Sequence, residues 1–320
     1  MLGLFTLFIF VGMVLLGCSE NTDEDVAANE AENYPTQPIT LVVPFDSGSV
    51  TDLFARMIAE RLSESLDTPV IIENLPGGGT IPGHVQVAQA NSDGYTLGIG
   101  ALAVEITLHG EESTISSLDD LDSLVQLGEY TTGISVSADS DIESIEDLQD
   151  LDEQITVAPA AAGSINHLYW DLVAEHYGVE DYGLMSTTGG NDAVLKLLSG
   201  DADVVSTPLA NVVEHVESGD VRLLALTTSD TVPGMEDIPT IEELGIDNPL
   251  THNLLLIAPE GLPEGVREVL INHTEEIVSD PEVQEEMENM ELIPTFLKGE
   301  ELDNQINEGR EAIHQILDGN

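Results

Sequence analysis

The chain has 320 residues and a formal net charge of −54 at pH 7, with only seven lysines and arginines. So few cations cannot neutralise a nucleic-acid backbone, which argues strongly against nucleic acid as a partner. The length predicts about two domains, and a 42 % share of hydrophobic residues in periodic segments argues against intrinsic disorder. Repulsion among so many carboxylates is screened only in concentrated salt, so the charge is typical of a halophilic or salt-adapted extracellular protein.

The first residues predict the compartment. An apolar run from Leu2 to Leu16 has the length of a signal-peptide core and is too short for a good membrane span. It ends in Leu-Gly-Cys at Cys18, a lipobox pattern in which the cysteine is lipidated and becomes the mature N-terminus. We therefore expect a lipoprotein signal peptide over 1–17 and a flexible acidic tether over 18–33, with lipid holding the protein to the outer side of the membrane.

Cys18 is the single cysteine of the chain, so disulfides and cysteine-based metal sites are excluded. The alternative is an ordinary signal peptide in which Cys18 is a buried thiol. No lysine or arginine precedes the apolar run, so the true start of the protein would lie upstream of Met1.

From Tyr34 onwards, segments with strand and helix patterns alternate. The most informative unit is an apolar strand from Ile39 to Phe45, a tight turn over 46–50 and an amphipathic helix from Asp52 to Leu66. A helix that starts at the carboxyl end of a strand presents unpaired N–H groups and the positive end of its dipole. This arrangement favours an anionic ligand.

The rest of the first lobe completes a βαβαβ pattern. The elements expected here are strands at 70–73 and 95–100, a Gly/Pro loop at 74–83, a short helix at 84–90 and a helix at 118–127. A strand near 133–136 is then expected to cross into a second lobe.

The strand, turn and helix design recurs over Thr156 to Tyr177. The second lobe is expected to contain strands near Thr156, Leu184, Val204 and Leu223, and helices at 164–177, 192–199 and 210–218. Glycines that follow these helices are predicted to end them. The chain then returns through a strand at 252–258 and helices that begin at Pro263, Pro281 and Gly299.

Two α/β lobes joined by two crossings make a hinge and an interlobe cleft. We expect lobe 1 to comprise 34–132 and 251–320, and lobe 2 to comprise 133–250. The final helix is amphipathic and is expected to pack on lobe 1.

Several segments carry a resemblance to a known family. They are YPTQPITLVVPFDSGSVTDLFAR, IIENLPGGGTIPG, NSDGYTL, AGSINHL, TGGNDAVLKLLSGDADV and IPTIEELGI, in this order. Together they resemble the substrate-binding proteins of tripartite tricarboxylate transporters, also called the Bug family. The resemblance covers the chain from Tyr34 to its C-terminus. It implies a two-lobe type II periplasmic-binding-protein fold that closes on a small organic carboxylate and delivers it to membrane permease subunits.

The resemblance also implies which residues contact the ligand. The first turn of the site (45–52) contributes Phe45, Ser47, Gly48, Ser49, Thr51 and Asp52. The second turn (160–167) contributes Ala160, Ala161, Gly163, Ser164 and His167. Thr187 and Gly189 stand where relatives often have a Tyr before a Gly, so this wall of the cleft is expected to be less aromatic.

Several roles stay open at this point. Asp52 either caps its helix or contacts the ligand, His167 either orients the second turn or contacts the ligand, and Phe45 is either a cleft wall or a core residue. Asp46 occupies a usually small position and would repel an anion if it pointed into the cleft. A neutral or amine-bearing ligand is therefore an alternative. The same fold could also serve a sensor that presents its bound solute to a signalling receptor.

The sequence gives little support for an enzymatic function. A hydrolytic triad would have to be assembled from Ser47 or Ser164 with His167 and Asp52, but the sequence has no G-x-S-x-G elbow. The eight histidines form no H-x-x-x-H pair typical of a metal hydrolase. We expect a monomeric binding protein without catalytic residues, metal or cofactor.

Overall fold

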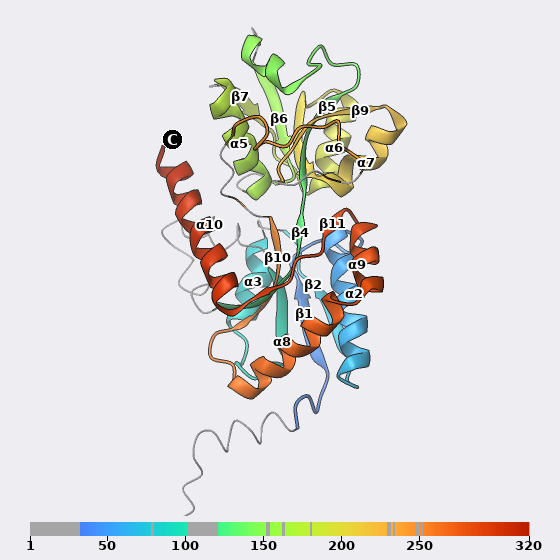
Figure 1. Cartoon of the computed structure of the whole chain (residues 1–320), viewed down its shortest axis with the longest axis vertical. Coiled ribbons are helices and arrows are strands. Elements are labelled where there is room, and N and C mark those ends of the chain that lie inside the picture. Colours follow the sequence, from blue (N-terminus) through green and yellow to red (C-terminus); the bar gives the residue numbers. More distant parts are fainter. Residues whose placement is uncertain are drawn as a thin grey trace, which may run out of the picture.

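The computed structural model describes residues 33–319 apart from 78–79, 101–120, 152–153, 162–163, 180, 229–231, 233, 247–249 and 251. Cys18 and the segments expected to be a signal peptide and a tether lie outside the described residues. The described chain forms two α/β lobes, each built on one sheet, stacked along the long axis of the molecule (Figure 1). The predicted two-lobe α/β fold class is confirmed.

The first lobe is built on a sheet with strand order β11-β4-β10-β3-β1-β2, and β12 pairs with the same strand β4. The strands are β1 Ile39–Val43, β2 Val70–Asn74, β3 Thr96–Gly100, β4 Leu121–Tyr130, β10 Asn253–Pro259, β11 Leu292–Ile293 and β12 Leu297–Lys298. Strands β1, β2 and β3 are parallel, and β10 lies antiparallel between β3 and β4. The carboxyl ends of β1, β2 and β3 therefore share one edge of the sheet.

Helices cover this sheet because each has an apolar stripe. They are α2 Val50–Ser65, α3 Ile81–Ala88, α8 Glu264–Val278 and α9 Pro281–Glu288. In α2, residues Phe54, Ala55, Ile58 and Leu62 are at most 1 % exposed, and they join the apolar cluster that contains Leu41. The spacing of these residues follows the 3.6-residue helical period, as predicted.

The helix expected over 118–127 is wrong for the residues that the structure describes, because 121–127 belong to strand β4. Leu121, Leu124 and Val125 are spaced as they would be on a helix face. However, β4 pairs with β10 on one side and with β11 and β12 on the other. Pairing with distant strands overrides the local pattern here.

The second lobe has strand order β7-β6-β8-β5-β9. Its strands are β5 Thr132–Ser137, β6 Ile155–Pro159, β7 Tyr182–Leu184, β8 Val204–Pro208 and β9 Val221–Leu226, and its helices are η2 Ile145–Asp150, α5 Ile165–Tyr177, α6 Gly190–Ser199 and α7 Leu209–Ser218. Gly178, Gly200 and Gly219 end the three α-helices with φ of +73°, +79° and +81°, as predicted.

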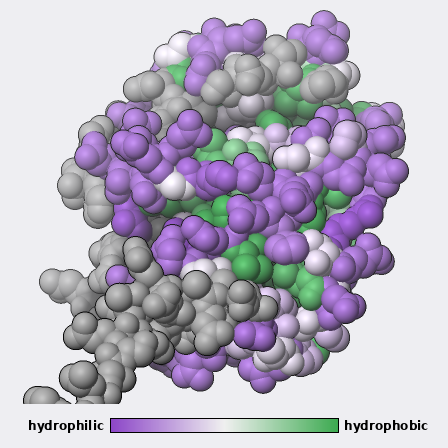
Figure 2. Space-filling view, turned by 60° about the horizontal axis from the view of Figure 1, so that its bottom comes forward, coloured by the Kyte–Doolittle hydropathy of each residue, from purple (hydrophilic) through white to green (hydrophobic). Residues whose placement is uncertain are grey.

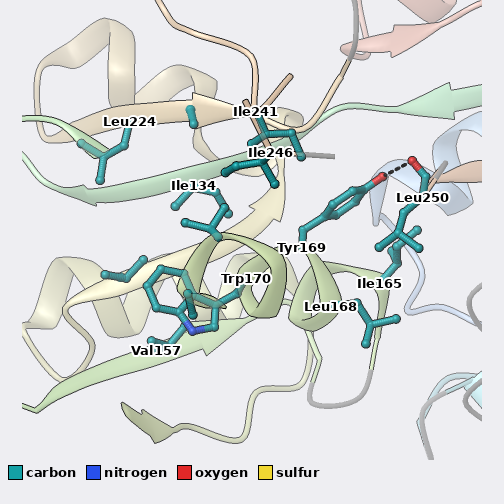
Figure 3. Packing of buried hydrophobic residues seen from close by; sticks show 14 of the residues in the cluster. Ile134, Val157, Ile165, Leu168, Tyr169, Trp170, Leu224, Ile241, Ile246 and Leu250 are labelled. Atoms are coloured by element: carbon teal, nitrogen blue, oxygen red, sulfur yellow. Dashed lines mark hydrogen bonds between the residues drawn. The ribbon is translucent and has the colours of Figure 1, made fainter. Parts of the chain in front are cut away.

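Helix α5 fills the core of the second lobe (Figure 3). Trp170 is fully buried beside Ile134 and Val157, while the Tyr169 hydroxyl donates to the Leu250 carbonyl at 3.2 Å. Tyr169 thereby ties α5 to the segment by which the chain returns to the first lobe.

The two lobes are joined at Thr131, since β4 ends at Tyr130 and β5 begins at Thr132. The chain returns between β9 and β10, and the last helix, α10 Gly299–Gly319, runs beside both lobes (Figure 1). This helix packs on β4 and β12 of the first lobe, as expected, and also contacts α5 of the second. Leu302 and Ile306 are buried in the same apolar cluster as Ile165.

The surface agrees with the composition. Hydrophilic residues cover most of the coloured face in Figure 2, with smaller hydrophobic areas between them. Among the described helices, none combines the length and apolar character required to cross a membrane.

Candidate functional site

The first turn lies between the end of β1 and the start of α2. The Ser49 N–H donates to the Asp46 carbonyl at 3.1 Å, and Gly48 has a φ of +87°, as in a type II turn. The Ser49 hydroxyl accepts from the Asp52 N–H at 3.2 Å and caps α2. Ser49 is therefore the cap residue, and the capping alternative for Asp52 is wrong.

Asp52 instead holds the first turn together. Its side chain is 1 % exposed; Oδ2 accepts from the Gly48 N–H at 2.8 Å and from Arg56 Nε at 2.9 Å, and Oδ1 accepts from Asn74 Nδ2 at 2.8 Å. Burial acts to raise the pKa of Asp52, but the hydrogen bonds from Arg56, Gly48 and Asn74 outweigh it and hold the pKa below its usual value. The carboxylate is thus ionised and its two oxygens are used within the protein.

Sequence reasoning did not assign Arg56 or Asn74 to this site. Arg56 Nη2 donates to Asn74 Oδ1 at 3.1 Å and lies 3.5 Å from Ser47 Oγ, while Asn74 Nδ2 also donates to the Phe45 carbonyl at 3.1 Å. The sequence did contain a signal for this pair, because Arg56 follows Asp52 by four residues on one helix, a spacing at which opposite charges can pair. The Arg56 side chain is 48 % exposed, so a cation stands beside the first turn.

Phe45 and Asp46 have different surroundings. Phe45 is half-buried against the core of the first lobe, and Asp46 is exposed. Phe45 thus has both a core contact and an accessible part, and whether Asp46 affects the ligand stays a prediction.

The second turn lies between the end of β6 and the start of α5. Ser164 is the cap residue by position, but its hydroxyl donates back to the Ala161 carbonyl at 2.7 Å. Thr187 Oγ1 lies 2.6 Å from the Pro159 carbonyl and 2.9 Å from the Ala160 carbonyl, so it fastens this turn to the neighbouring loop. The Ala160 N–H donates to the main-chain carbonyl of Ser206, which lies in strand β8. Gly163 lies outside the described residues.

His167 and Gly189 lie farther along this lobe. His167 Nε2 is 3.5 Å from the Tyr182 hydroxyl and 3.6 Å from Asp171 Oδ1, which favours its orienting role. Gly189 is the cap residue of α6. A Cβ at the next residue, Gly190, would lie 2.2 Å from Asn211 Oδ1, so the Asn211 side chain would have to move.

The starts of α2 and α5 are each hydrogen-bonded to a residue next to the crossing between the lobes. Thr51 Oγ1 lies 2.6 Å from the Tyr130 hydroxyl, and Thr132 Oγ1 donates to Asn166 Oδ1 at 2.8 Å. Tyr130 and Thr132 flank Thr131, and two residues of a strand span only about 6.6 Å. Both helix starts are therefore tied to the same crossing from opposite lobes, although their sequences are more than 100 residues apart.

His252 lies on the segment that returns to the first lobe and contacts Tyr130 at the crossing. Its carbonyl accepts from the Tyr130 N–H at 2.7 Å, and its ring lies 4.6 Å from the Tyr130 ring, centroid to centroid. Burial lowers the pKa of His252 to about 3, so the ring is neutral at physiological pH.

This arrangement can bind an anion but does not resemble a catalytic centre. The first N–H groups of α2 and α5 have no acceptor within their helices. Among the residues that the structure describes, no group of three or more metal-ligating side chains occurs.

Comparisons with known proteins agree with this description. The family model described as "Tripartite tricarboxylate transporter family receptor" matches residues 54–318. A UPF0065 protein of Bordetella bronchiseptica is 32 % identical over 267 residues, which cover 81 % of this chain and 78 % of the relative. Protein BugT of Bordetella pertussis is 29 % identical over 284 residues, which cover 85 % of this chain and 86 % of BugT.

A solved structure shows the same fold. Rpa4515 from R. palustris, determined with adipate, superposes with a TM-score of 0.80 at 24 % sequence identity, over 88 % of this chain and 97 % of that one. The family match spans most of the chain and confirms the resemblance found in the sequence. The chain therefore belongs to the receptor family of the tripartite tricarboxylate transporters, the Bug-type periplasmic solute-binding proteins, and is not an enzyme.

Proposed function

We propose that this protein captures a small organic carboxylate between its two lobes and delivers it to the permease subunits of a tripartite tricarboxylate-type transporter. The observation that supports the proposal is that two helix starts from opposite lobes are each hydrogen-bonded to a residue beside Thr131. A carboxylate between them would receive N–H donors and the positive ends of two helix dipoles.

Closure about the crossing is the proposed mechanism of capture. Ligand contacts from both lobes can form together only when the lobes approach, so the ligand stabilises the closed state by its differential affinity. Residues of the first turn (Phe45, Ser47, Gly48, Ser49 and Thr51) and of the second turn (Ala160, Ala161, Gly163 and Ser164) are the proposed contacts. Asp52, His167 and Thr187 would act mainly by shaping these turns.

A thermal-shift screen of the protein in roughly 2 M salt tests this proposal. The panel contains adipate, which is bound in the structurally similar Rpa4515, together with malate, citrate and the matching amides. A ligand at about 100 times its Kd adds about 2.7 kcal/mol, which moves the Tm of a protein of this size by several degrees. Shifts with carboxylates and none with amides are expected. Shifts with amides or amines alone would contradict carboxylate binding and support an effect of Asp46.

Delivery needs a separate test, because a receptor for signalling could close on the same ligand. We expect a strain that lacks this protein to lose uptake of the carboxylate that shifts the Tm. Normal uptake with a lost transcriptional response would support the sensor alternative instead.

Lipid anchoring at Cys18 is also proposed from the sequence pattern. The native protein should partition with membranes and carry a lipid mass on its N-terminal peptide. The variant Cys18→Ala should lose this modification, and an unmodified Cys18 in the native protein would contradict the proposal.

A further inference from the structure

Asn166 is a buried polar residue at the start of α5 that no sequence argument assigned to the site. Its side chain and backbone are 4 % exposed as a whole. Oδ1 accepts from Thr132 Oγ1 at 2.8 Å, and the Asn166 main-chain carbonyl accepts from Ser206 Oγ at 2.6 Å. Thr132 and Ser206 are themselves completely buried, so Asn166 is held from two sides.

The Thr132 hydrogen bond shows which way the amide points. Because the hydroxyl donates to Oδ1, the amide oxygen faces Thr132 and the Nδ2 amino group lies on the other side. Within the part of the chain that the structure describes, no hydrogen bond joins Nδ2 to another residue, and Nδ2 is not among the unpartnered side-chain atoms that are sealed from solvent. Nδ2 is therefore open to water, and an acceptor that arrives from outside the chain can take the place of this water.

The position of Asn166 indicates which acceptor this is. Asn166 is the second residue of the helix that follows the second turn, and Thr51 occupies the same place in the helix that follows the first turn. Each contacts one neighbour of Thr131, so both helix starts lie beside the crossing between the lobes. An anion bound between these starts would lie beside the Nδ2 donor and the positive end of α5.

We propose that Asn166 Nδ2 donates a hydrogen bond to a carboxylate oxygen of the bound solute, and that Thr132 is a positioning residue that orients this amide from the interlobe crossing. The inference rests on the proposed carboxylate function and names a ligand-contacting residue for it. Binding would then use a neutral donor, which suits a protein with few cations.

The test compares variants by isothermal titration with adipate, malate and citrate in roughly 2 M salt. Asn166→Asp keeps the size of the side chain and an oxygen for Thr132, but it replaces the amino donor by a negative oxygen. We expect it to weaken binding of the carboxylate bound by the wild type by roughly 10- to 100-fold. Asn304→Asp adds the same charge at an exposed position on α10 and should leave the affinity unchanged.

Thr132 needs a readout that separates orientation from stability. Thr132→Val removes the hydroxyl at similar volume and should weaken binding several-fold, while Thr132→Ser should restore wild-type affinity although it also alters packing. Wild-type affinity in Asn166→Asp would overturn the proposed contact, and wild-type affinity in Thr132→Val would overturn the positioning role. If the wild type bound none of the three carboxylates, the proposed function would fail and this inference with it.

Discussion

The buried carboxylate of Asp52 offers the sharpest test of how the first turn is held. In Asp52→Asn, one oxygen is replaced by an amino group, which must then face either Asn74 Nδ2 or the Gly48 N–H and Arg56 Nε. Every orientation of the new amide therefore sets donor against donor on at least one side. The variant loses the ion pair and at least one of the hydrogen bonds to the carboxylate.

The magnitude follows from these contacts. A hydrogen bond to a charged group contributes about 1.5–3 kcal/mol, but the Arg56 side chain is 48 % exposed and its share is reduced by solvent. We expect Asp52→Asn to lower the free energy of unfolding by about 2–4 kcal/mol at pH 7. Urea denaturation at constant high salt, followed by circular dichroism, measures the change.

The pH dependence gives an independent check. The pKa of Asp52 is lower in the folded protein than in the unfolded chain. Its contribution to stability is therefore present above the unfolded pKa of about 3.9 and is lost as the pH falls through the folded value. Asp52→Asn should remove this part of the acid unfolding profile.

A matched control comes from the second lobe. Asp192 also pairs with a basic residue four positions later, Lys196. Its Oδ1 lies 3.8 Å from Lys196 Nζ, and the Asp192 side chain is 33 % exposed. Asp192→Asn should cost less than about 1 kcal/mol. Equal losses in the two variants, or a loss below about 0.5 kcal/mol in Asp52→Asn, would refute the role assigned to Asp52.

Three further predictions concern the site and the charge. Gly48→Ala should destabilise the protein by about 1 kcal/mol, because its φ of +87° disfavours any side chain although the space around it is open; an unchanged Tm would contradict this. Tyr130→Phe should cost about 1 kcal/mol and speed amide hydrogen exchange at the start of α2, whereas Tyr34→Phe, which removes a hydroxyl bonded to Gly94 at 2.6 Å elsewhere in the first lobe, should leave that segment unchanged. The Tm should rise between about 0.1 and 2 M NaCl as repulsion is screened, and a flat response would argue against salt adaptation.

The features that depend on local sequence were predicted well. The unit from Ile39 to Leu66 has a buried strand, a glycine turn and an amphipathic helix, and each rests on neighbouring residues. The glycines that end α5, α6 and α7 were predicted for the same reason.

The features that depend on distant residues were not predicted. Strand β4 is set by partners more than 100 residues away, and its leucines fit a helix equally well. The two-residue strands β11 and β12 are too short to leave a periodic pattern. The acceptor role of Asp52 depends on Asn74, and the orientation of Asn166 depends on Thr132, 34 residues earlier.

The place of β10 in the first sheet has a consequence for the order in which the lobes fold. This strand lies between β3 and β4, yet it follows the whole second lobe in the sequence. The second lobe is one continuous segment and can fold as soon as it has been synthesised, whereas β3 and β4 keep unpaired edges until residues 253–259 appear. The lobe that begins the chain is therefore the last to be completed.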